Sequence, residues 1–241
     1  MAIFYIALFI IIAALTGYLL GSVSFAVLIT KYVYHVDIYS IGSGNAGGTN
    51  VGRAVGKVGA FSVIFLDAIK CTLPIWIWFF VCNLTGLQNL IPAGVSMGWI
   101  YYTAGFAAAV GHTFPLYHHF KGGKAVSCYA GFVMFTNPII GIIGFSFFLA
   151  VYFFTKRVSV GSIATVIFGL ILAIIAAVFP APFEWTFLFN SALRFDGSYV
   201  FAVYMFIYAS YVVLRHRPNI IRIINKTEPE THYKKKNNSQ K

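Results

Sequence analysis

Charged residues are scarce in this sequence of 241 residues: Asp, Glu, Lys and Arg make up 10% of it, whereas ordinary soluble domains contain about a quarter. With 59% hydrophobic residues and a mean hydropathy of +0.81, the chain is not an ordinary soluble domain. Cysteine is scarce too. Cys71, Cys82 and Cys128 are an odd number in or beside apolar segments, which matches neither a disulfide framework nor a zinc spacing. We expect them to be packing residues, and we predict no metal site and no cofactor.

What is abundant is apolar sequence in runs that could cross a bilayer, which takes about 20 residues per helix. Seven such runs predict an all-α integral membrane protein with seven transmembrane helices. They lie at residues 3–25, 59–82, 94–112, 124–136, 138–155, 160–181 and 197–214. The fourth is short, so we expect it to tilt, to pack against its neighbour through Asn137-Pro138, or to be re-entrant. The first is expected to stay in place, because no basic residue precedes it as in a signal peptide.

The basic residues are distributed asymmetrically. Of 17 Lys and Arg, only Arg194 falls outside the segments after predicted spans 1, 3, 5 and 7 or the cytoplasmic half of span 2. Because positive residues stay on the cytoplasmic side, we predict an outer N-terminus, a cytoplasmic C-terminus, and cytoplasmic re-entrant or glycine-rich loops. The net charge of +11 therefore needs no nucleic-acid partner. We expect residues 1–226 to form one polytopic domain, and 227–241 a disordered basic tail attracted to anionic lipids.

The most polar stretch is the loop from Gly42 to Arg53. Its glycines allow turns with positive φ and a close approach to a ligand, while its hydroxyl, amide and backbone N–H groups can donate to an anion. Arg53 adds a permanent charge whose planar fork matches phosphate or carboxylate. The loop is not a Walker loop, because Gly48 rather than lysine follows Gly47. Taken alone, it is compatible with an anion-binding site and with a glycine-rich turn packed between helices.

Three further segments on the predicted cytoplasmic side carry basic or hydroxyl groups: residues 111–126, 156–162 and 215–228. In the first, Lys124 stands where a helix N-terminus would add N–H donors. In the second, Ser159 is expected to be a helix N-cap. Two unit charges 5 Å apart repel by about 3 kcal/mol at an effective dielectric constant of 20. Four converging segments therefore predict a site that brings two phosphate compounds together and offsets their repulsion.

Inside the second predicted span, Asp67 and Lys70 lie three residues apart on one helix face. A lone charge there would cost about 2.5 to 3.5 kcal/mol on insertion scales. We expect the two to neutralise one another. A purely structural pair and a pair that also orients the neighbouring polar loop are both compatible with this spacing.

The polar segments contain three longer motifs. Residues 42–53 read Gly-Ser-Gly-Asn-x-Gly-x-Thr-Asn-x-x-Arg. The second motif is Gly111-His112-x-Phe-Pro with Phe120-Lys-Gly-Gly-Lys124, and the third is Arg215-His216-x-x-Asn219-Ile-x-Arg222 with Glu228. Together they resemble the motifs of the bacterial acyl-phosphate:glycerol-3-phosphate 1-acyltransferases, the PlsY family, and the likeness covers most of the chain. Among small departures, Ser24 replaces a usual proline, and Ala125 and Lys226 stand where glycine is common in the family.

The resemblance implies a multi-pass enzyme of the bacterial cytoplasmic membrane with its active site facing the cytoplasm. It would transfer a fatty acyl group from acyl phosphate to the 1-hydroxyl of glycerol 3-phosphate, giving lysophosphatidic acid and inorganic phosphate for phospholipid biosynthesis. Its partners would be these substrates and membrane lipids, and a monomer is expected. The predicted catalytic residues are Ser43, Arg53, Lys124, His216 and Asn219. The predicted substrate- and phosphate-binding residues are Gly42, Gly44, Asn45, Thr49, Asn50, His112, Lys121, Gly122, Gly123, Ser159, Ser162, Arg222 and Glu228.

No serine or cysteine nucleophile with an adjacent base is evident in the sequence, so we predict direct attack without an acyl-enzyme intermediate. Either His216 or the substrate's own phosphate would accept the hydroxyl proton. None of the six histidines has Asp five positions later, so the His-x4-Asp mechanism of other acyltransferases does not apply. The alternative function is a membrane carrier for a phosphorylated small molecule. It predicts a polar path through the bilayer and often repeated halves, whereas the charges here gather on one face.

Overall fold

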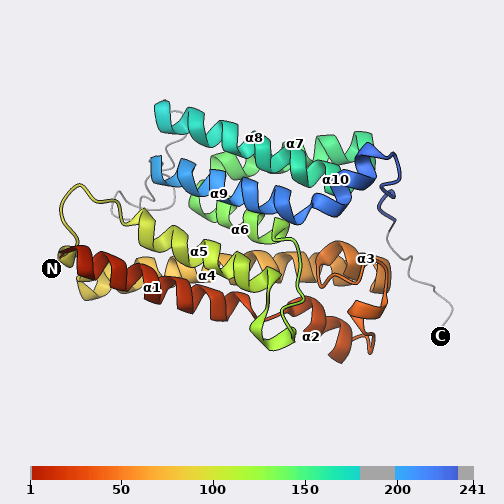
Figure 1. Ribbon diagram of the computed structural model, residues 1–241, viewed down its shortest axis with the longest axis horizontal. Helices are drawn as coiled ribbons and strands as arrows, with labels where there is room; N and C mark the ends of the chain where they lie inside the picture. Colours follow the sequence, from red (N-terminus) through yellow and green to blue (C-terminus); the bar gives the residue numbers. More distant parts are fainter. Residues whose placement is uncertain (1, 180–198, 233–241) are drawn as a thin grey trace.

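The computed structural model describes residues 2–179 and 199–232, and within them it contains helices and loops but no strand. Figure 1 shows seven longer helices that run side by side: α1 (Ala2–Gly21), α4 (Lys57–Thr85), α5 (Gly98–Thr113), α6 (Val126–Thr136), α7 (Pro138–Thr155), α8 (Val158–Val178) and α9 (Tyr199–Arg215). The short elements are α2 (Phe25–Tyr32), α3 (Gly48–Val55), α10 (Arg217–Ile224) and the 3-10 turns η1 (Ile38–Ser40), η2 (Leu87–Leu90) and η3 (Leu116–His118). The all-α prediction is confirmed for the described residues.

The seven longer helices correspond to the seven predicted spans, but their lengths differ. Within the described residues, four helical segments are long and apolar enough to cross a membrane: Ala2–Tyr32, α4, α7 and α8. The pair α9 and α10 qualifies only as one span that bends by 62°. Helices α5 and α6 have 16 and 11 residues and are shorter than a full crossing. Seven spans and their orientation therefore stay predictions.

The polar segments gather at one end of the bundle. In Figure 1, α2, α3 and α10 lie at the end remote from the N-terminus, and residues 86–97 lie at the N-terminal end. The second-motif loop that follows α5 is at the same end as α2. The helices thus act as a scaffold that brings together segments far apart in the sequence.

Helix α1 packs directly on α5 through small residues. A Cβ atom on Gly17 would lie 2.1 Å from the carbonyl oxygen of Ala104, and one on Gly21 would lie 2.0 Å from that of Ala108. Close backbone approach of this kind is how transmembrane helices associate without a hydrophobic driving force between them. It fixes the end of α5, and so the start of the second motif, relative to the first span.

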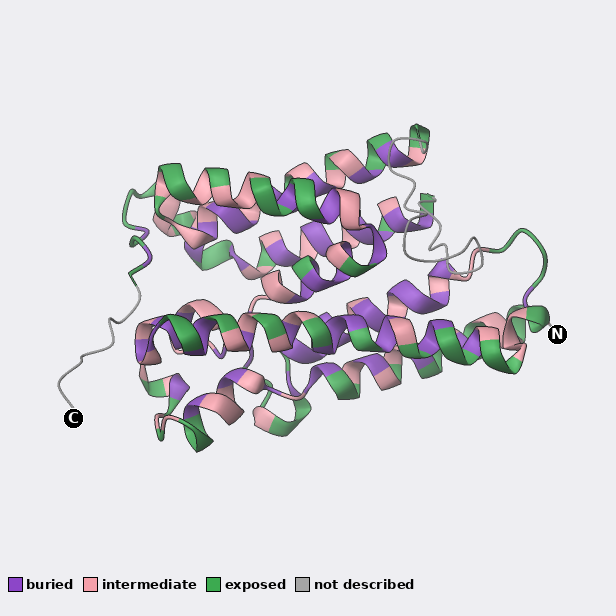
Figure 2. Ribbon diagram, turned by 180° about the vertical axis from the view of Figure 1, so that it is seen from behind, coloured by how far each residue is buried: buried purple, intermediate pink, exposed green. Residues whose placement is uncertain are grey.

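The short helix α6 packs against α7 through Asn137-Pro138, which was one of three arrangements that we expected for it. Asn137 caps α7 by accepting a hydrogen bond from the Ile140 N–H at 3.1 Å, and Pro138 occupies the first turn, where its missing N–H costs nothing. The backbone of Gly141 touches Met134 across the junction. Large apolar side chains are exposed, among them Phe61, Phe65, Phe154 and Ile171. Figure 2 shows exposed positions along the outer faces of the helices. This is the surface expected of a protein immersed in lipid.

The three cysteines are buried free thiols, consistent with the predicted packing role. The predicted Asp67–Lys70 pair is also present, with 2.9 Å between Asp67 Oδ1 and Lys70 Nζ. Lys70 Nζ donates a second hydrogen bond, 2.6 Å long, to the carbonyl oxygen of Val23 between α1 and α2. His112 Nδ1 approaches the same Asp67 oxygen at 3.5 Å. The pair therefore joins α4 to α5 and to the corner between α1 and α2.

Candidate functional site

The first-motif loop is shaped from within by Asn50. Its side-chain oxygen accepts from the Ser43 N–H at 3.0 Å, and its amide nitrogen donates to the carbonyls of Ile38 and Ile41 at 3.2 and 2.9 Å. A Cβ on Gly42, whose φ is +60°, would lie 2.3 Å from that same oxygen. Asn50 is only 3% exposed, so the structure places this predicted phosphate-binding residue inside the loop, where its side chain supports the backbone.

The other first-motif residues remain accessible. Ser43 is exposed, and Asn45 donates to its hydroxyl oxygen at 3.2 Å. Thr49 and Arg53 are half-buried on α3, and Gly44, with φ of +65°, completes the turn before it. These side chains can face an anion without disrupting the fold.

The second motif packs directly against the first. Gly47 and Gly123 adjoin, since a Cβ on Gly47 would lie 3.8 Å from Gly123 Cα. The Tyr39 hydroxyl donates to the Lys121 carbonyl at 2.7 Å, whereas the Lys121 side chain is exposed. A Cβ on Gly122 would lie 2.0 Å from the carbonyl oxygen of His112. Gly122 and Gly123 are therefore required by close packing, whatever their contact with substrate.

His112, which we predicted to bind substrate, lies inside the protein. It is buried between Asp67, which faces Nδ1, and Gly123, where an added Cβ would lie 2.1 Å from Nε2. The imidazole is thus enclosed by protein groups and supports the Gly122-Gly123 turn. We assigned it to substrate binding because its position within the motif does not reveal which neighbours surround it.

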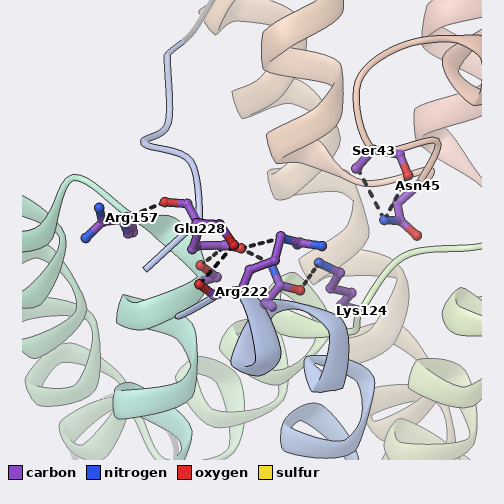
Figure 3. A network of polar contacts seen from close by, with 9 residues as sticks. Ser43, Asn45, Lys124, Arg157, Arg222 and Glu228 are labelled. Atoms are coloured by element: carbon purple, nitrogen blue, oxygen red, sulfur yellow. Dashed lines mark hydrogen bonds and ion pairs between the residues drawn. The ribbon is translucent and has the colours of Figure 1, made fainter. Parts of the chain in front are cut away.

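The third motif is joined to the second by a chain of hydrogen bonds (Figure 3). Lys124 Nζ donates to Asn219 Oδ1 at 2.6 Å, and Asn219 Nδ2 donates to Glu228 Oε1 at 2.7 Å. Glu228 Oε1 also accepts from the Ser159 hydroxyl at 2.6 Å, and Oε2 pairs with Arg222 Nε at 2.7 Å. The Glu228 network, as we call these five residues, connects the loop before α6, helices α8 and α10, and the segment after α10.

Glu228 lies at the centre of that network, where its carboxylate accepts hydrogen bonds from protein groups. Its side chain is 6% exposed, while the Arg222 side chain is 41% exposed. Burial alone would raise the pKa of Glu228, but hydrogen bonds from Ser159, Asn219 and Arg222 outweigh it and hold the pKa below its usual value. A buried carboxylate repels phosphate, so Glu228 acts by positioning the donors around it. The structure thus places Glu228, a predicted phosphate-binding residue, among hydrogen-bond donors of the protein.

We predicted that Ser159 is the N-cap of α8, and this prediction is wrong. The helix begins at Val158, and Arg157 occupies the cap position without a side-chain cap bond. The Ser159 hydroxyl is free to donate to Glu228 because it lies one residue inside the helix. Ser162 is also placed differently: its hydroxyl is 1% exposed and donates to the Val158 carbonyl at 2.7 Å, within α8.

The segment after α10 is tied to the bundle. Arg157 Nε donates to the Glu228 carbonyl at 2.9 Å, and the Thr231 N–H donates to the Lys156 carbonyl at 2.9 Å. A domain boundary at residue 227 would therefore separate Glu228 from its own network. The rest of the predicted tail, 233–241, lies outside the described residues, as do Arg194 and residues 180–198.

His216 lies at the 62° bend between α9 and α10. Its Nδ1 is 2.8 Å from the Val212 carbonyl, an acceptor, so Nδ1 carries the proton and Nε2 carries the lone pair of the neutral ring. Burial lowers the pKa of His216 to about 4, and the nearby Lys124 and Arg215 contribute to this. His216 is therefore a neutral hydrogen-bond and proton acceptor at physiological pH.

Positive charge concentrates around Lys124. Burial lowers its pKa to about 8, Glu228 opposes that shift, and Arg222, Arg53 and Arg215 add to it. Three guanidinium groups from two motifs thus act electrostatically on one ammonium group. In Figure 3, Lys124 lies at one end of the Glu228 network, and the Ser43–Asn45 pair of the first motif is drawn in the same close view. Such an arrangement can neutralise an anion that carries more than one charge.

The sequence prediction missed Arg157 and Tyr39, whose contacts hold the site together. Arg157 stands in a basic segment that was recognised, but only its serines were selected. Tyr39 carries no signal in the sequence, because its partner is a backbone carbonyl 82 residues away. No group of three or more His, Cys, Asp or Glu among the described residues is arranged to hold a metal ion.

Comparison with known proteins gives a consistent result. Residues 11–226 match the family model described as glycerol-3-phosphate acyltransferase. A glycerol-3-phosphate acyltransferase of Mycoplasma capricolum is 37% identical, in an alignment that covers 94% of each of the two chains. A glycerol-3-phosphate acyltransferase of Bacillus cytotoxicus is also 37% identical, in an alignment that covers 92% of this chain and 95% of the relative. Two crystal structures of the integral membrane glycerol 3-phosphate acyltransferase PlsY, in glycerol 3-phosphate and lysophosphatidic acid forms, superpose with a TM-score of 0.71 at 26% identity. They cover 92% of this chain, and this chain covers 96% and 94% of theirs.

Proposed function

This chain belongs to the glycerol-3-phosphate acyltransferase family and is a membrane acyltransferase, and from that premise we propose that it transfers a fatty acyl group from acyl phosphate to the 1-hydroxyl of glycerol 3-phosphate. The products are lysophosphatidic acid and inorganic phosphate. The protein acts as a multi-pass monomer of the bacterial cytoplasmic membrane, with seven spans, an outer N-terminus and an active site that faces the cytoplasm. The positive residues after alternate predicted spans support this orientation.

The observation that carries the proposal is that groups of the three motifs act together at Lys124. This second-motif residue donates a hydrogen bond to Asn219 of the third motif at 2.6 Å (Figure 3). Arg53, Arg215 and Arg222 all act on the Lys124 charge. A site for one phosphate needs fewer cations than this, whereas the acyl donor and the acceptor proposed here each bring a phosphate group.

The reaction is a direct displacement. The 1-hydroxyl oxygen forms a bond to the acyl carbonyl carbon, the bond from that carbon to the phosphate oxygen breaks, and inorganic phosphate leaves with the electron pair. Because acyl phosphate is a mixed anhydride with a good leaving group, the enzyme mainly has to align the reactants and neutralise charge. The hydroxyl proton passes to His216 Nε2 or to a substrate phosphate.

The test is an assay of purified protein in detergent with palmitoyl phosphate and labelled glycerol 3-phosphate, without acyl-CoA or acyl-carrier protein. We expect labelled lysophosphatidic acid, and about a ten- to hundredfold lower rate for Arg53→Ala, because hydrogen bonds to charged groups contribute about 1.5 to 3 kcal/mol. Arg217→Ala is the matched control, since Arg217 is exposed at the start of α10. Product formed only when acyl-CoA is supplied would overturn the proposed donor.

The carrier alternative has no observation in its favour. The segments that carry the three motifs lie at one end of the bundle (Figure 1), and the related proteins are acyltransferases. Exchange of glycerol 3-phosphate across proteoliposomes in the absence of acyl phosphate would revive it.

A further inference from the structure

Arg215, the last residue of α9, has an unusual environment for a guanidinium group. Its Nε is buried and has no hydrogen-bond partner among the described residues. Its Cζ lies 4.8 Å from the centre of the Phe114 ring, so the guanidinium group is held over an aromatic face. Stacking fixes the orientation of the group but leaves its in-plane N–H donors for another partner.

The charges around Arg215 make its position costly in the free protein. It lies close enough to Lys124 and to His216 to lower the pKa of both. Burying a polar nitrogen without a partner costs free energy, and doing so beside another cation adds repulsion. An anion bound at this point would satisfy the nitrogen and remove the repulsion together. The arrangement therefore fits a ligand more closely than it fits a purely structural contact.

The backbone next to Phe114 indicates which phosphate would bind here. Thr113 precedes Phe114, and a Cβ on Gly122 would lie 2.7 Å from the Thr113 carbonyl oxygen. The ring that supports Arg215 is thus attached to the same backbone that packs against the Gly122-Gly123 turn. Gly122 and Gly123 are among the residues predicted to bind substrate, and we assign to this turn the acceptor of the function proposed above, glycerol 3-phosphate.

We propose that Arg215, stacked on Phe114, binds the phosphate of glycerol 3-phosphate. The guanidinium group of Arg215, in the third motif, supplies directional donors, and Lys124, in the second motif, supplies a second positive charge. This inference rests on the proposed function for the identity of the acceptor, but it concerns binding of glycerol 3-phosphate and not the nature of the acyl donor. Binding and turnover can therefore be measured separately.

The first measurement is equilibrium binding of labelled glycerol 3-phosphate to purified protein without any acyl donor. We expect Arg215→Ala to weaken binding about tenfold or more, and Arg217→Ala to leave it unchanged. Phe114→Leu keeps the charge but removes the ring, so it should weaken binding by a smaller factor. If Arg215→Ala binds as tightly as Arg217→Ala, the inference is wrong.

The second measurement separates a ligand contact from a structural one. In the transfer assay, Arg215→Lys should raise KM for glycerol 3-phosphate and leave KM for palmitoyl phosphate near its wild-type value, because lysine keeps the charge and loses the planar fork. This milder variant also serves if Arg215→Ala does not fold. Unchanged KM for glycerol 3-phosphate, or a rise confined to palmitoyl phosphate, overturns the assignment. Wild-type protein that binds glycerol 3-phosphate but does not use acyl phosphate overturns the proposed donor and leaves Arg215 in place.

Discussion

At the scale of single residues, His216 shows how the fold selects a protonation state. The hydrogen bond from Nδ1 to the Val212 carbonyl fixes the tautomer, and burial beside Lys124 and Arg215 disfavours the imidazolium form. A histidine in solution would be partly protonated near pH 6.5. The fold thus offers a lone pair on Nε2 throughout the range in which an ordinary histidine changes charge.

This state leads to a prediction about pH dependence. With a pKa lowered to about 4, His216 of the free protein stays neutral as pH falls from 8 to 5, so it contributes no acidic limb to kcat/KM in that range. A limb near pH 6 belongs to the second ionisation of the substrate phosphate. We expect that limb in wild-type protein and in His216→Gln alike, with kcat about a hundredfold lower in the variant. A limb that vanishes in His216→Gln while turnover remains measurable would show that the imidazole titrates there.

Two other residues adopt backbone conformations that suit glycine. Ala125 has φ of +63° and Lys226 has φ of +58°, and glycine is common at both positions in the family that the sequence resembles. A side chain in this left-handed region costs about 1 to 2 kcal/mol, partly offset by the smaller entropy of the unfolded chain. Ala125 and Lys226, which depart from the family pattern, therefore lower the stability of the protein slightly.

We expect Lys226→Gly to raise the free energy of unfolding by about 0.5 to 1 kcal/mol, measured as a higher unfolding temperature in mild detergent. The control is Lys31→Gly, which lies within α2 and should lower stability, because glycine is a poor helix former. Equal effects of the two substitutions would contradict the proposed strain at Lys226.

At the scale of elements, the buried ion pair in α4 joins three parts of the bundle. Asp67 contacts Lys70 and His112, and Lys70 also reaches the Val23 carbonyl. The pair thus fixes α4, the end of α5 and the corner before α2 relative to one another. Because His112 in turn adjoins Gly123, the position of the second motif depends on a carboxylate inside the second predicted span.

Removing one charge of this pair should destabilise the protein strongly. We expect Asp67→Asn to cost about 3 to 5 kcal/mol, because it leaves the Lys70 ammonium group buried and uncompensated. The double variant Asp67→Asn with Lys70→Met should recover part of that loss, since neither charge then remains. Thermal unfolding of four proteins in the same detergent, namely the wild type, Asp67→Asn, Lys70→Met and the double variant, measures the coupling. Additive effects of the two substitutions would mean that the pair does not stabilise the fold.

At the scale of the whole molecule, the separation of polar loops to one end of the bundle predicts how the protein is inserted. The segments that carry the three motifs lie together, and residues 86–97 lie at the other end. Because the three natural cysteines are buried, single cysteines placed in the loops can report accessibility against a low background.

We expect Lys57→Cys to react with a membrane-impermeant maleimide only from the cytoplasmic side, and Asn89→Cys only from the outside. Both positions are exposed in the structure. Labelling of intact cells and of inverted membrane vesicles provides the two orientations. Labelling of both positions from the same side would contradict an odd number of crossings between them.

The sequence alone determined the class of protein and the segments that form the candidate site. Apolar runs fixed the helices within a few residues, because a lipid-exposed backbone must satisfy its hydrogen bonds internally. The spacing of Asp67 and Lys70 predicted their pairing, because residues three apart share a helix face. The three motifs identified the segments of the site, and the comparisons confirmed the family that they resemble.

Only the tertiary structure decided which polar residues of the candidate site remain accessible and which are buried against other protein groups. Asn50, His112 and Glu228 have side chains as suitable for phosphate or substrate contacts as those of their neighbours, yet each is buried against partners from other parts of the chain. Ser159 failed as a predicted cap for the same reason, since its partner lies 69 residues away. Motif spacing reports local geometry, whereas these roles depend on contacts that form only when distant helices pack.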